Sequence, residues 1–324
     1  MSNTPRRILI TGATGFVGRA LCQALIGEGH DVQVLLRDPS QFSQIPLALG
    51  AGYIIGSLED KRSLGEACSG RELVIHLAGL AHVGKGLERQ AMESNFVGAS
   101  NLLIAATNAR VRRFLYLSST LAEAAATGEG DVTAYGESKF QAEQLIEAAS
   151  KQGKISSVIL RSVNVYGAGM KGNISRMISM IERGRLPPLP EVNNQISLIS
   201  VDDLAAALLL AMETDESGQK SYTVTDGESY SVAAMERAIY AALGKSFPRW
   251  RTPHMVLYGA SQIAGFVSSI TGGSGAISAR TYRNLISDNL FSNEKAVSEL
   301  GFKPSTTFYE ELPKLIESIR ESAE

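Results

Sequence analysis

Short apolar runs alternate with amphipathic stretches through the first half of the chain. Runs that stop at glycine, serine or charged residues are typical of strands buried on both faces of a parallel sheet. They lie at 7–11, 32–36, 53–55, 73–78, 114–117 and 157–160. Apolar residues with helical spacing follow at 16–29, 91–108 and 135–150. This alternation predicts βαβ units and, with right-handed crossovers, an α/β protein with a doubly wound parallel sheet.

The pattern changes after residue 166. A turn-rich stretch occupies 184–190, and two further strands are expected at 198–201 and 222–225, flanking an apolar helix over 204–212. These strands are compatible with a return to the first sheet. We therefore expect one domain over 1–166 together with about 191–226. A smaller C-terminal domain is expected over about 167–190 and 227–324.

Composition removes several function classes. The chain has 324 residues, 44% of them hydrophobic and 20% charged, with a formal net charge of −2. A globular protein is indicated, without the basic field that nucleic-acid binding requires. The cysteines, Cys22 and Cys68, form neither a metal-ligand pattern nor a disulfide framework, which favours a cytoplasmic protein without a metal.

Residues 252–279 contain no Asp, Glu, Lys or Arg, a stretch long enough to cross a bilayer. The stretch also contains Pro253, Gln262 and five glycines. A buried helix followed by a loop is therefore the favoured interpretation, and no integral membrane span is expected. Peripheral contact with the inner membrane is the alternative.

A glycine motif stands between the first strand and the first helix. Its spacing is Gly-x-x-Gly-x-x-Gly, in the place where a dinucleotide fingerprint occurs. Glycines let the backbone approach a pyrophosphate, and the helix N-terminus offers free N–H groups. The expected cofactor contacts are Gly12, Thr14, Gly15, Phe16, Val17 and Gly18. Glycines serving only strand–helix packing are the alternative.

Tyr135 and Lys139 stand four residues apart in a predicted helix, so both side chains can reach one point. A nearby ammonium favours phenolate and lowers the tyrosine pKa from about 10. Such a tyrosine can pass a proton to or from a sugar or alcohol oxygen. An ordinary amphipathic helix face remains the alternative for this pair alone.

In combination these motifs resemble the extended short-chain dehydrogenase/reductase superfamily, also called the NAD-dependent epimerase/dehydratase family. The resemblance covers nearly the whole chain in order. Further matching segments are His76-Leu-Ala-Gly79, Asn95-Phe-Val-Gly98-Ala-Ser-Asn101, Leu160-Arg161-Ser-Val-Asn164-Val-Tyr166-Gly167, Val201-Asp202-Asp203-Leu204-Ala205 and Leu300-Gly301-Phe302-Lys-Pro304. It implies a Rossmann domain followed by a substrate-binding domain.

The resemblance also implies roles for single residues. Tyr135 is expected to be the general acid/base, and Lys139 to bind the nicotinamide ribose and lower the Tyr135 pKa. Thr120, at the end of the fifth strand, is expected to hydrogen-bond the reacting oxygen. Ser118 and Ser119 are interpreted as a polar strand cap near the cofactor. Asn95 is expected either to support catalysis or to hold the sheet edge.

The implied cofactor is NADP(H), favoured over NAD(H). Arg37 follows the second strand and can pair with a 2′-phosphate, whereas Asp38 leaves NAD open. Ser57 stands where the family usually has an acidic adenine contact. Besides the glycine motif, Tyr135 and Lys139, the expected contacts are Arg37, Ser57, Leu58, Leu77, Ala78, Gly79, Asn95, Ser118 and Ser162.

The expected reaction is hydride transfer at C4 of a nucleotide-diphosphate sugar, a UDP-sugar above all, in surface polysaccharide precursor synthesis. Thr120, Tyr135 and Asn164 are the expected substrate contacts. Thr120 is followed by Leu121-Ala122, not the Asp-Glu pair of 4,6-dehydratases, so a 4-keto-sugar reductase or a 4-epimerase is favoured. Alternatives are a non-sugar ketone or alcohol, such as a hydroxysteroid, and a non-catalytic dinucleotide-binding protein.

Two smaller expectations complete the sequence-based interpretation. The family commonly has arginine where Ile196 falls here, so a guanidinium for the diphosphate has to come from elsewhere. Arg176, Arg280 and Arg283 are candidates, and a solvated helix charge is the favoured interpretation of any one of them. Related proteins dimerise through two helices, which correspond to 91–108 and 135–150. A homodimer is therefore expected.

Overall fold

The computed structural model describes residues 4–44, 51–81, 88–128, 132–192, 194–214, 218–253, 255–256, 258–259 and 287–322. The chain forms two compact units. Unit 1 comprises Met1–Val163, Val201–Val224 and Asn293–Lys303, and unit 2 comprises Asn164–Ser200, Thr225–Ser292 and Pro304–Glu324. Arg280, Arg283 and most of the uncharged stretch 252–279 lie outside the described residues.

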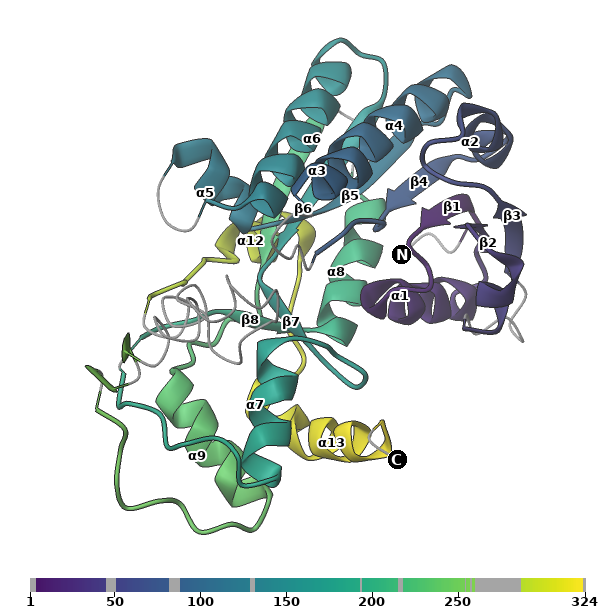
Figure 1. The fold of residues 1–324 in the computed structure, drawn as a ribbon. Coiled ribbons are helices and arrows are strands. Elements are labelled where there is room, and N and C mark those ends of the chain that lie inside the picture. The colour runs from purple at the N-terminus through teal and green to yellow at the C-terminus, as the bar shows by residue number, and fades with distance from the viewer. Residues whose placement is uncertain are drawn as a thin grey trace. The chain divides into compact units, whose positions relative to one another are not determined.

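Unit 1 is built on a seven-stranded sheet in the order β3-β2-β1-β4-β5-β6-β9 (Figure 1). Every pairing in it is parallel. The strands are β1 (Arg7–Thr11), β2 (Asp31–Leu36), β3 (Gly52–Ile55), β4 (Leu73–His76), β5 (Arg113–Ser119), β6 (Ser156–Ser162) and β9 (Gln219–Val224). The predicted doubly wound α/β fold is confirmed, since chain order reverses between β1 and β4.

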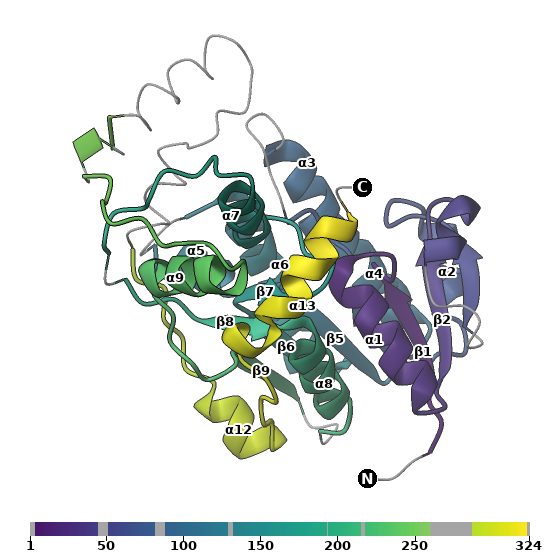
Figure 2. The same cartoon turned by 90° about the horizontal axis from the view of Figure 1, so that it is seen from below.

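Helices cover both faces of this sheet. On one face lie α2 (Lys61–Cys68), α4 (Gly98–Asn108) and α6 (Ala134–Lys151), and on the other lie α1 (Phe16–Gly27) and α8 (Val201–Met212) (Figures 1 and 2). Shorter described elements of unit 1 include the 3₁₀ turn η1 (Pro39–Gln44), α3 (Glu88–Met92), α5 (Leu121–Thr127) and α12 (Glu294–Leu300). Burial on both sides explains why these strands read as continuous apolar runs.

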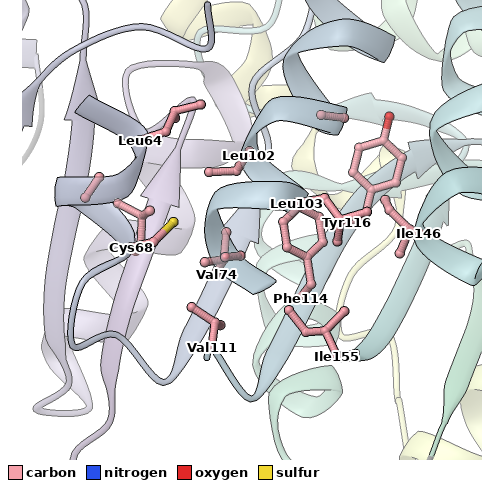
Figure 3. Close-up of a cluster of buried hydrophobic side chains, with 14 of the residues drawn as sticks. Leu64, Cys68, Val74, Leu102, Leu103, Val111, Phe114, Tyr116, Ile146 and Ile155 are labelled. Atoms are coloured by element: carbon pink, nitrogen blue, oxygen red, sulfur yellow. The ribbon is translucent and has the colours of Figure 1, made fainter. Parts of the chain in front are cut away.

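The core under α2, α4 and α6 fixes these helices to the sheet. Leu102 of α4, Ile146 of α6 and Phe114 of β5 are completely buried in it (Figure 3). Each such side chain contributes about 1.5–3 kcal/mol. Tyr116 belongs to the same cluster, and its hydroxyl points away from Phe114 (Figure 3). The core therefore holds α6 rigidly beneath the edge where β5 ends.

The helix expected over 91–108 is interrupted. A π-helical turn, η3 (Glu93–Val97), separates α3 from α4. Such a turn holds one extra residue, and π-turns are frequent at functional sites. Asn95 lies within it and is fully buried. The irregularity thus aims an amide side chain inward.

Of the two later strands, only one returns to the main sheet. β9 takes the edge of β6, as the sequence allowed. Residues 198–200 form β8 (Leu198–Ser200) and pair instead with β7 (Asn164–Tyr166) in unit 2. The expectation for 198–200 was wrong because β8 pairs with β7, a short strand that follows directly after β6 in the chain. Unit 2 also contains α7 (Asn173–Glu182), α9 (Val232–Ala242) and α13 (Phe308–Glu321).

Unit 2 is centred on a buried carboxylate. The hydroxyls of Tyr166 and Tyr230 donate to Asp226 Oδ2 at 3.1 and 2.7 Å, and Glu228 N donates to its Oδ1 at 3.1 Å. Tyr230 Oη also accepts from Phe308 N at 3.1 Å, which secures the start of α13. Every polar atom of this cluster has a partner, so its role is explained by packing alone.

Candidate active site

Tyr135 and Lys139 lie on the first turns of α6, whose start is fixed by two neighbours. The Thr133 hydroxyl accepts from Gly136 N at 2.8 Å and caps the helix. A Cβ on Gly136 would lie 2.3 Å from Leu121 O, so only glycine lets α6 approach α5 this closely. The position of Tyr135 is therefore set by the helix cap and by α5.

Lys139 is almost completely buried. Its Nζ donates to Leu117 O at 2.8 Å and lies 4.5 Å from the centre of the Tyr116 ring and 6.0 Å from that of Tyr135. Burial lowers the pKa of Lys139 to about 8, against the opposing effect of the Glu143 carboxylate. The ammonium is thus held close to its titration point.

For the Tyr135 hydroxyl, the expected lowering of pKa is not found. Burial raises the pKa of Tyr135 to about 12, and a hydrogen bond with Ser119 only partly offsets this. The physical reason is that Lys139 Nζ is directed to a carbonyl of β5, so removal from water outweighs its charge at Tyr135. In this structure Tyr135 is a protonated phenol at neutral pH.

Ser119 is a residue whose place the sequence interpretation missed. Its hydroxyl is hydrogen-bonded to Tyr135 and accepts from Leu121 N at 3.3 Å. Thr120 is buried, and its backbone N–H donates to Ser162 O at 3.1 Å. Ser119 and Thr120 are adjacent hydroxyl residues, and they differ in the direction in which their hydroxyls point from the end of β5. The catalytic role of Thr120 stays a prediction.

The glycine motif forms a tight turn between β1 and α1. Gly12 has φ +79°, and a Cβ there would lie 2.6 Å from Ala78 N. A Cβ on Gly18 would lie 2.1 Å from Gly12 O, so both positions exclude larger residues. Gly15 is exposed and, as the N-cap of α1, has no side chain to cap the first N–H groups. These groups fit an anionic pyrophosphate.

The other members of the motif line the same turn. Thr14, Phe16 and Val17 are half-buried around it. Leu77 and Ala78, also half-buried, follow β4, and Leu77 N donates to Thr11 O at 3.1 Å. The turn and the end of β4 therefore lie side by side, and the cofactor contacts expected of these residues stay a prediction.

Gly79 makes room for two site residues. A Cβ there would lie 2.8 Å from Asn95 Oδ1 and 3.5 Å from Lys139 Nζ. Asn95 Oδ1 accepts from Leu80 N at 2.7 Å, and Asn95 Nδ2 donates to Leu80 O at 3.2 Å and to Ser138 Oγ at 3.0 Å. The amide thus ties the segment after β4 to α6, the structural role that the sequence left open.

At the end of β2, Arg37 is exposed, whereas Asp38 is engaged locally. Asp38 Oδ1 accepts from Ser40 N at 2.8 Å, and this bond holds the pKa of Asp38 below its usual value. Ser57, which follows β3, is half-buried, and Leu58 packs against Gly98. Of the two side chains considered for contact with the adenosine ribose, Asp38 already accepts a hydrogen bond from Ser40 N, whereas Arg37 is exposed.

Three buried polar atoms near Lys139 have no hydrogen-bond partner among the described residues. They are His76 Nε2, Tyr116 Oη and Ser118 Oγ. His76 stacks on Tyr116 at 5.5 Å, and its Nδ1 is 2.6 Å from Thr11 Oγ1. Burial and then Lys139 lower the pKa of His76 to about 3, so the ring is neutral. On the neighbouring strand, Ser162 Oγ donates to Ser118 O at 3.4 Å.

Two of the residues expected to contact the substrate, Asn164 and Arg176, belong to unit 2. Asn164 is the exposed first residue of β7, and Arg176 is exposed on α7. Within the described ranges, no group of His, Cys, Asp or Glu could hold a metal ion. No helix there is long and apolar enough to cross a membrane.

Comparison with known proteins agrees with this geometry. The UDP-glucose 4-epimerase of Vibrio cholerae is 28% identical over 269 residues, 77% of this chain and 79% of the relative. The 2-alkyl-3-oxoalkanoate reductase of Stenotrophomonas maltophilia is 28% identical over 255 residues, 74% of this chain and 76% of the relative.

The same fold occurs in a crystal structure of UDP-glucose 4-epimerase with UDP-glucose from Thermotoga maritima. Its TM-score is 0.75 at 22% identity, covering 98% of this chain and 99% of the other. The family model for NAD dependent epimerase/dehydratase proteins matches residues 8–233. Together with the glycine turn and the Tyr135–Lys139 pair, this match shows that the chain belongs to the NAD-dependent epimerase/dehydratase family.

Proposed function

We propose that this protein catalyses NADP(H)-dependent hydride transfer at C4 of a nucleotide-diphosphate sugar, with a UDP-sugar as the substrate class. The observation that carries the proposal is the meeting of Tyr135, Lys139 and the glycine turn at the carboxyl edge of one parallel sheet. Ligands of open α/β sheets bind at this edge. The similarity to UDP-glucose 4-epimerases supports the substrate class.

The protonated state of Tyr135 supports a reductive step, which a 4-keto-sugar reductase performs once and a 4-epimerase performs in the second half of its reaction. A phenol that is protonated at neutral pH can donate its proton to a carbonyl oxygen as that oxygen gains charge. Ser119 holds the phenol, and Thr120 is the second hydroxyl for the substrate oxygen. Lys139 binds the ribose of the cofactor, whose nicotinamide ring supplies the hydride when bound. The proposal is therefore a 4-keto-sugar reductase or a 4-epimerase.

Arg37 supports NADP(H) over NAD(H). It is exposed and follows β2, where the 2′-position of an adenosine ribose is read. Asp38, the competing acceptor for ribose hydroxyls, is bonded to Ser40 N. Arg37→Ala is expected to weaken NADPH binding by about tenfold or more and to leave NADH binding nearly unchanged, because only the phosphate contact is removed. Equal loss for both cofactors would contradict this assignment.

The decisive experiment uses purified protein, NADPH and a UDP-4-keto sugar. A reductase consumes NADPH in proportion to product, and absorbance at 340 nm falls. A 4-epimerase interconverts UDP-sugars with no net consumption of cofactor. If neither reaction occurs, while NADPH binds, the sugar assignment is wrong and another carbonyl substrate is required.

A second candidate is an apolar ketone. The related 2-alkyl-3-oxoalkanoate reductase acts on a carbonyl of an alkyl chain, as its name states. In unit 2, large apolar side chains are exposed at Trp250, Met255, Val256 and Tyr258. Exposed apolar surface of this kind is suited to contact with an acyl chain. NADPH oxidation with a long-chain 3-oxo acid, and none with a UDP-4-keto sugar, would establish this alternative.

The proposal includes a homodimer through α4 and α6. Val97 and Ile104 are exposed seven residues apart, on one face of η3 and α4. A hollow of about 400 Å³ lies beside Ile104 between α2 and α4. Ile104→Lys is expected to convert the dimer to a monomer in sedimentation velocity. A wild-type monomer at micromolar concentration would contradict the dimer.

A further inference from the structure

Glu143 continues the line of Tyr135 and Lys139 along α6. The three residues are spaced by four, so they follow one another on the inner face of the helix. The Glu143 side chain is 2% exposed. It lies one helical turn after Lys139, where its carboxylate faces Arg161 of β6.

An arginine of β6 holds this carboxylate through three hydrogen bonds. Arg161 of β6 donates from Nε to both Glu143 oxygens at 3.1 and 3.2 Å and from Nη2 to Oε2 at 2.6 Å. Arg161 Nη1 also lies 3.8 Å from Glu123 Oε2 of α5. A buried bidentate pair of this kind is fixed in orientation, and removing one partner leaves an uncompensated charge.

The other groups facing Lys139 cannot replace Glu143. His76 of β4 is neutral, and Tyr116 of β5 and Tyr135 of α6 keep their protons because burial raises their pKa values. On α3 and η3, Arg89 and Glu93 form an exposed pair with each other. Among the described residues around Lys139, Glu143 is thus the carboxylate that raises the pKa of Lys139. Arg161 pairs with Glu143 and also lies close to Glu123.

We infer that Glu143, held by Arg161, is a positioning residue that sets the charge of Lys139. The inference rests on the proposed role of Lys139 in binding the cofactor ribose. A protonated amine donates charge-assisted hydrogen bonds to the ribose hydroxyls, and a neutral amine binds them more weakly. Burial lowers the pKa of Lys139 and Glu143 opposes this shift, so the Glu143–Arg161 pair adjusts the alkaline limit of cofactor binding.

The two partners make opposite predictions. Glu143→Gln removes the negative charge that opposes the lowering of the Lys139 pKa, so the amine loses its proton at lower pH. Arg161→Met leaves the Glu143 carboxylate uncompensated, so the amine keeps its proton to higher pH. A purely structural brace would weaken binding in both variants and shift the limit in neither.

The test measures NADPH affinity by fluorescence from pH 6 to 10 for the wild type and each variant. We expect the alkaline limit to move down by about half a pH unit or more in Glu143→Gln and up by a similar amount in Arg161→Met. Glu147→Gln is the matched control, since the same change one turn later affects a carboxylate paired with exposed Lys151. Its limit should not move.

A second readout needs no cofactor. The pH at which the unfolding free energy changes with Lys139 titration, taken relative to Lys139→Met, should move in the same opposite directions. Unchanged limits in folded Glu143→Gln and Arg161→Met, or shifts of the same sign, overturn the inference. If the wild type binds no NADPH at any pH, the proposed function fails, and the cofactor-free measurement still decides the role of Glu143.

Discussion

In unit 2, Asp226 accepts hydrogen bonds from two tyrosines and a backbone N–H, and each of these groups is satisfied. In unit 1, Tyr116 Oη and His76 Nε2 are equally buried but have no partner among the described residues. Both regions take tyrosines out of water beside an ionisable group. Around Asp226 every polar group is hydrogen-bonded within the protein, whereas around Tyr116 and His76 some polar atoms have no partner among the described residues. Because Tyr116 and His76 lie beside Lys139, their unused hydrogen-bonding capacity supports a ligand site there.

The largest expected effect separates chemistry from stability. Tyr135→Phe removes the proposed proton donor, so kcat should fall by about 10³-fold, within the usual range for general acid catalysis. The unfolding free energy should change by less than about 1 kcal/mol, because the lost hydroxyl makes one neutral hydrogen bond. Steady-state kinetics and urea unfolding measure the two quantities. Activity that survives undiminished would refute the assignment of Tyr135.

The converse change belongs to unit 2. Asp226→Ala leaves the Tyr230 hydroxyl and the backbone N–H of Glu228 without their acceptor, whereas the Tyr166 hydroxyl keeps Thr306 O at 3.2 Å. The expected cost is about 2–4 kcal/mol. The kcat of the folded fraction should stay within about threefold of the wild type, because no proposed proton transfer involves Asp226. Urea unfolding monitored by tyrosine fluorescence gives the loss. A loss below about 1 kcal/mol would show that the satisfied network is not what holds unit 2.

The pH dependence of stability sharpens the contrast. The pKa of Lys139 is about 8 in the folded protein and 10.5 in its ordinary state. Between these values the unfolded chain binds more protons, so rising pH stabilises the fold. Relative to Lys139→Met, the wild type should gain about 3 kcal/mol across this window and change little below it. A flat difference would mean that Lys139 titrates as an exposed lysine.

The smallest effect compares two tyrosines directly. Tyr116→Phe removes an unpaired hydroxyl and should leave stability unchanged or raise it by up to about 1 kcal/mol. Tyr230→Phe removes a donor to Asp226 and should cost about 1–2 kcal/mol. Thermal unfolding of both variants is sufficient. If Tyr116→Phe is the more destabilising, its hydroxyl has a partner in solution and the contrast between the units disappears.

The strands of unit 1 were predictable because burial on both faces leaves a continuous apolar run. The Tyr135–Lys139 pair was predictable because helical spacing alone brings both side chains to one face. The π-turn was not, since one extra residue hardly changes the apolar spacing over 91–108. The hydrogen bond between Ser119 and Tyr135 depends on which way a strand end turns, a choice that packing of α5 and α6 makes.

The later elements show a different limit. The pairing of 198–200 was mispredicted because an apolar run does not say which sheet edge is free. The Glu143–Arg161 pair has a signal in the sequence: Arg161 stands inside an otherwise apolar strand, and Glu143 stands one helical turn after Lys139. Neither residue is informative alone. Only their distance, which sequence does not give, joins them.

The π-turn at Glu93–Val97 makes the placement of Asn95 a matter of chain length. Deleting one residue within it would restore a regular helix and rotate everything on one side by about 100°, since an α-helix has 3.6 residues per turn. Asn95 would then turn away from Leu80 and Ser138 although no side chain had been exchanged. At this turn, insertions and deletions are therefore more consequential than point substitutions, both for divergence within the family and for redesign of the protein.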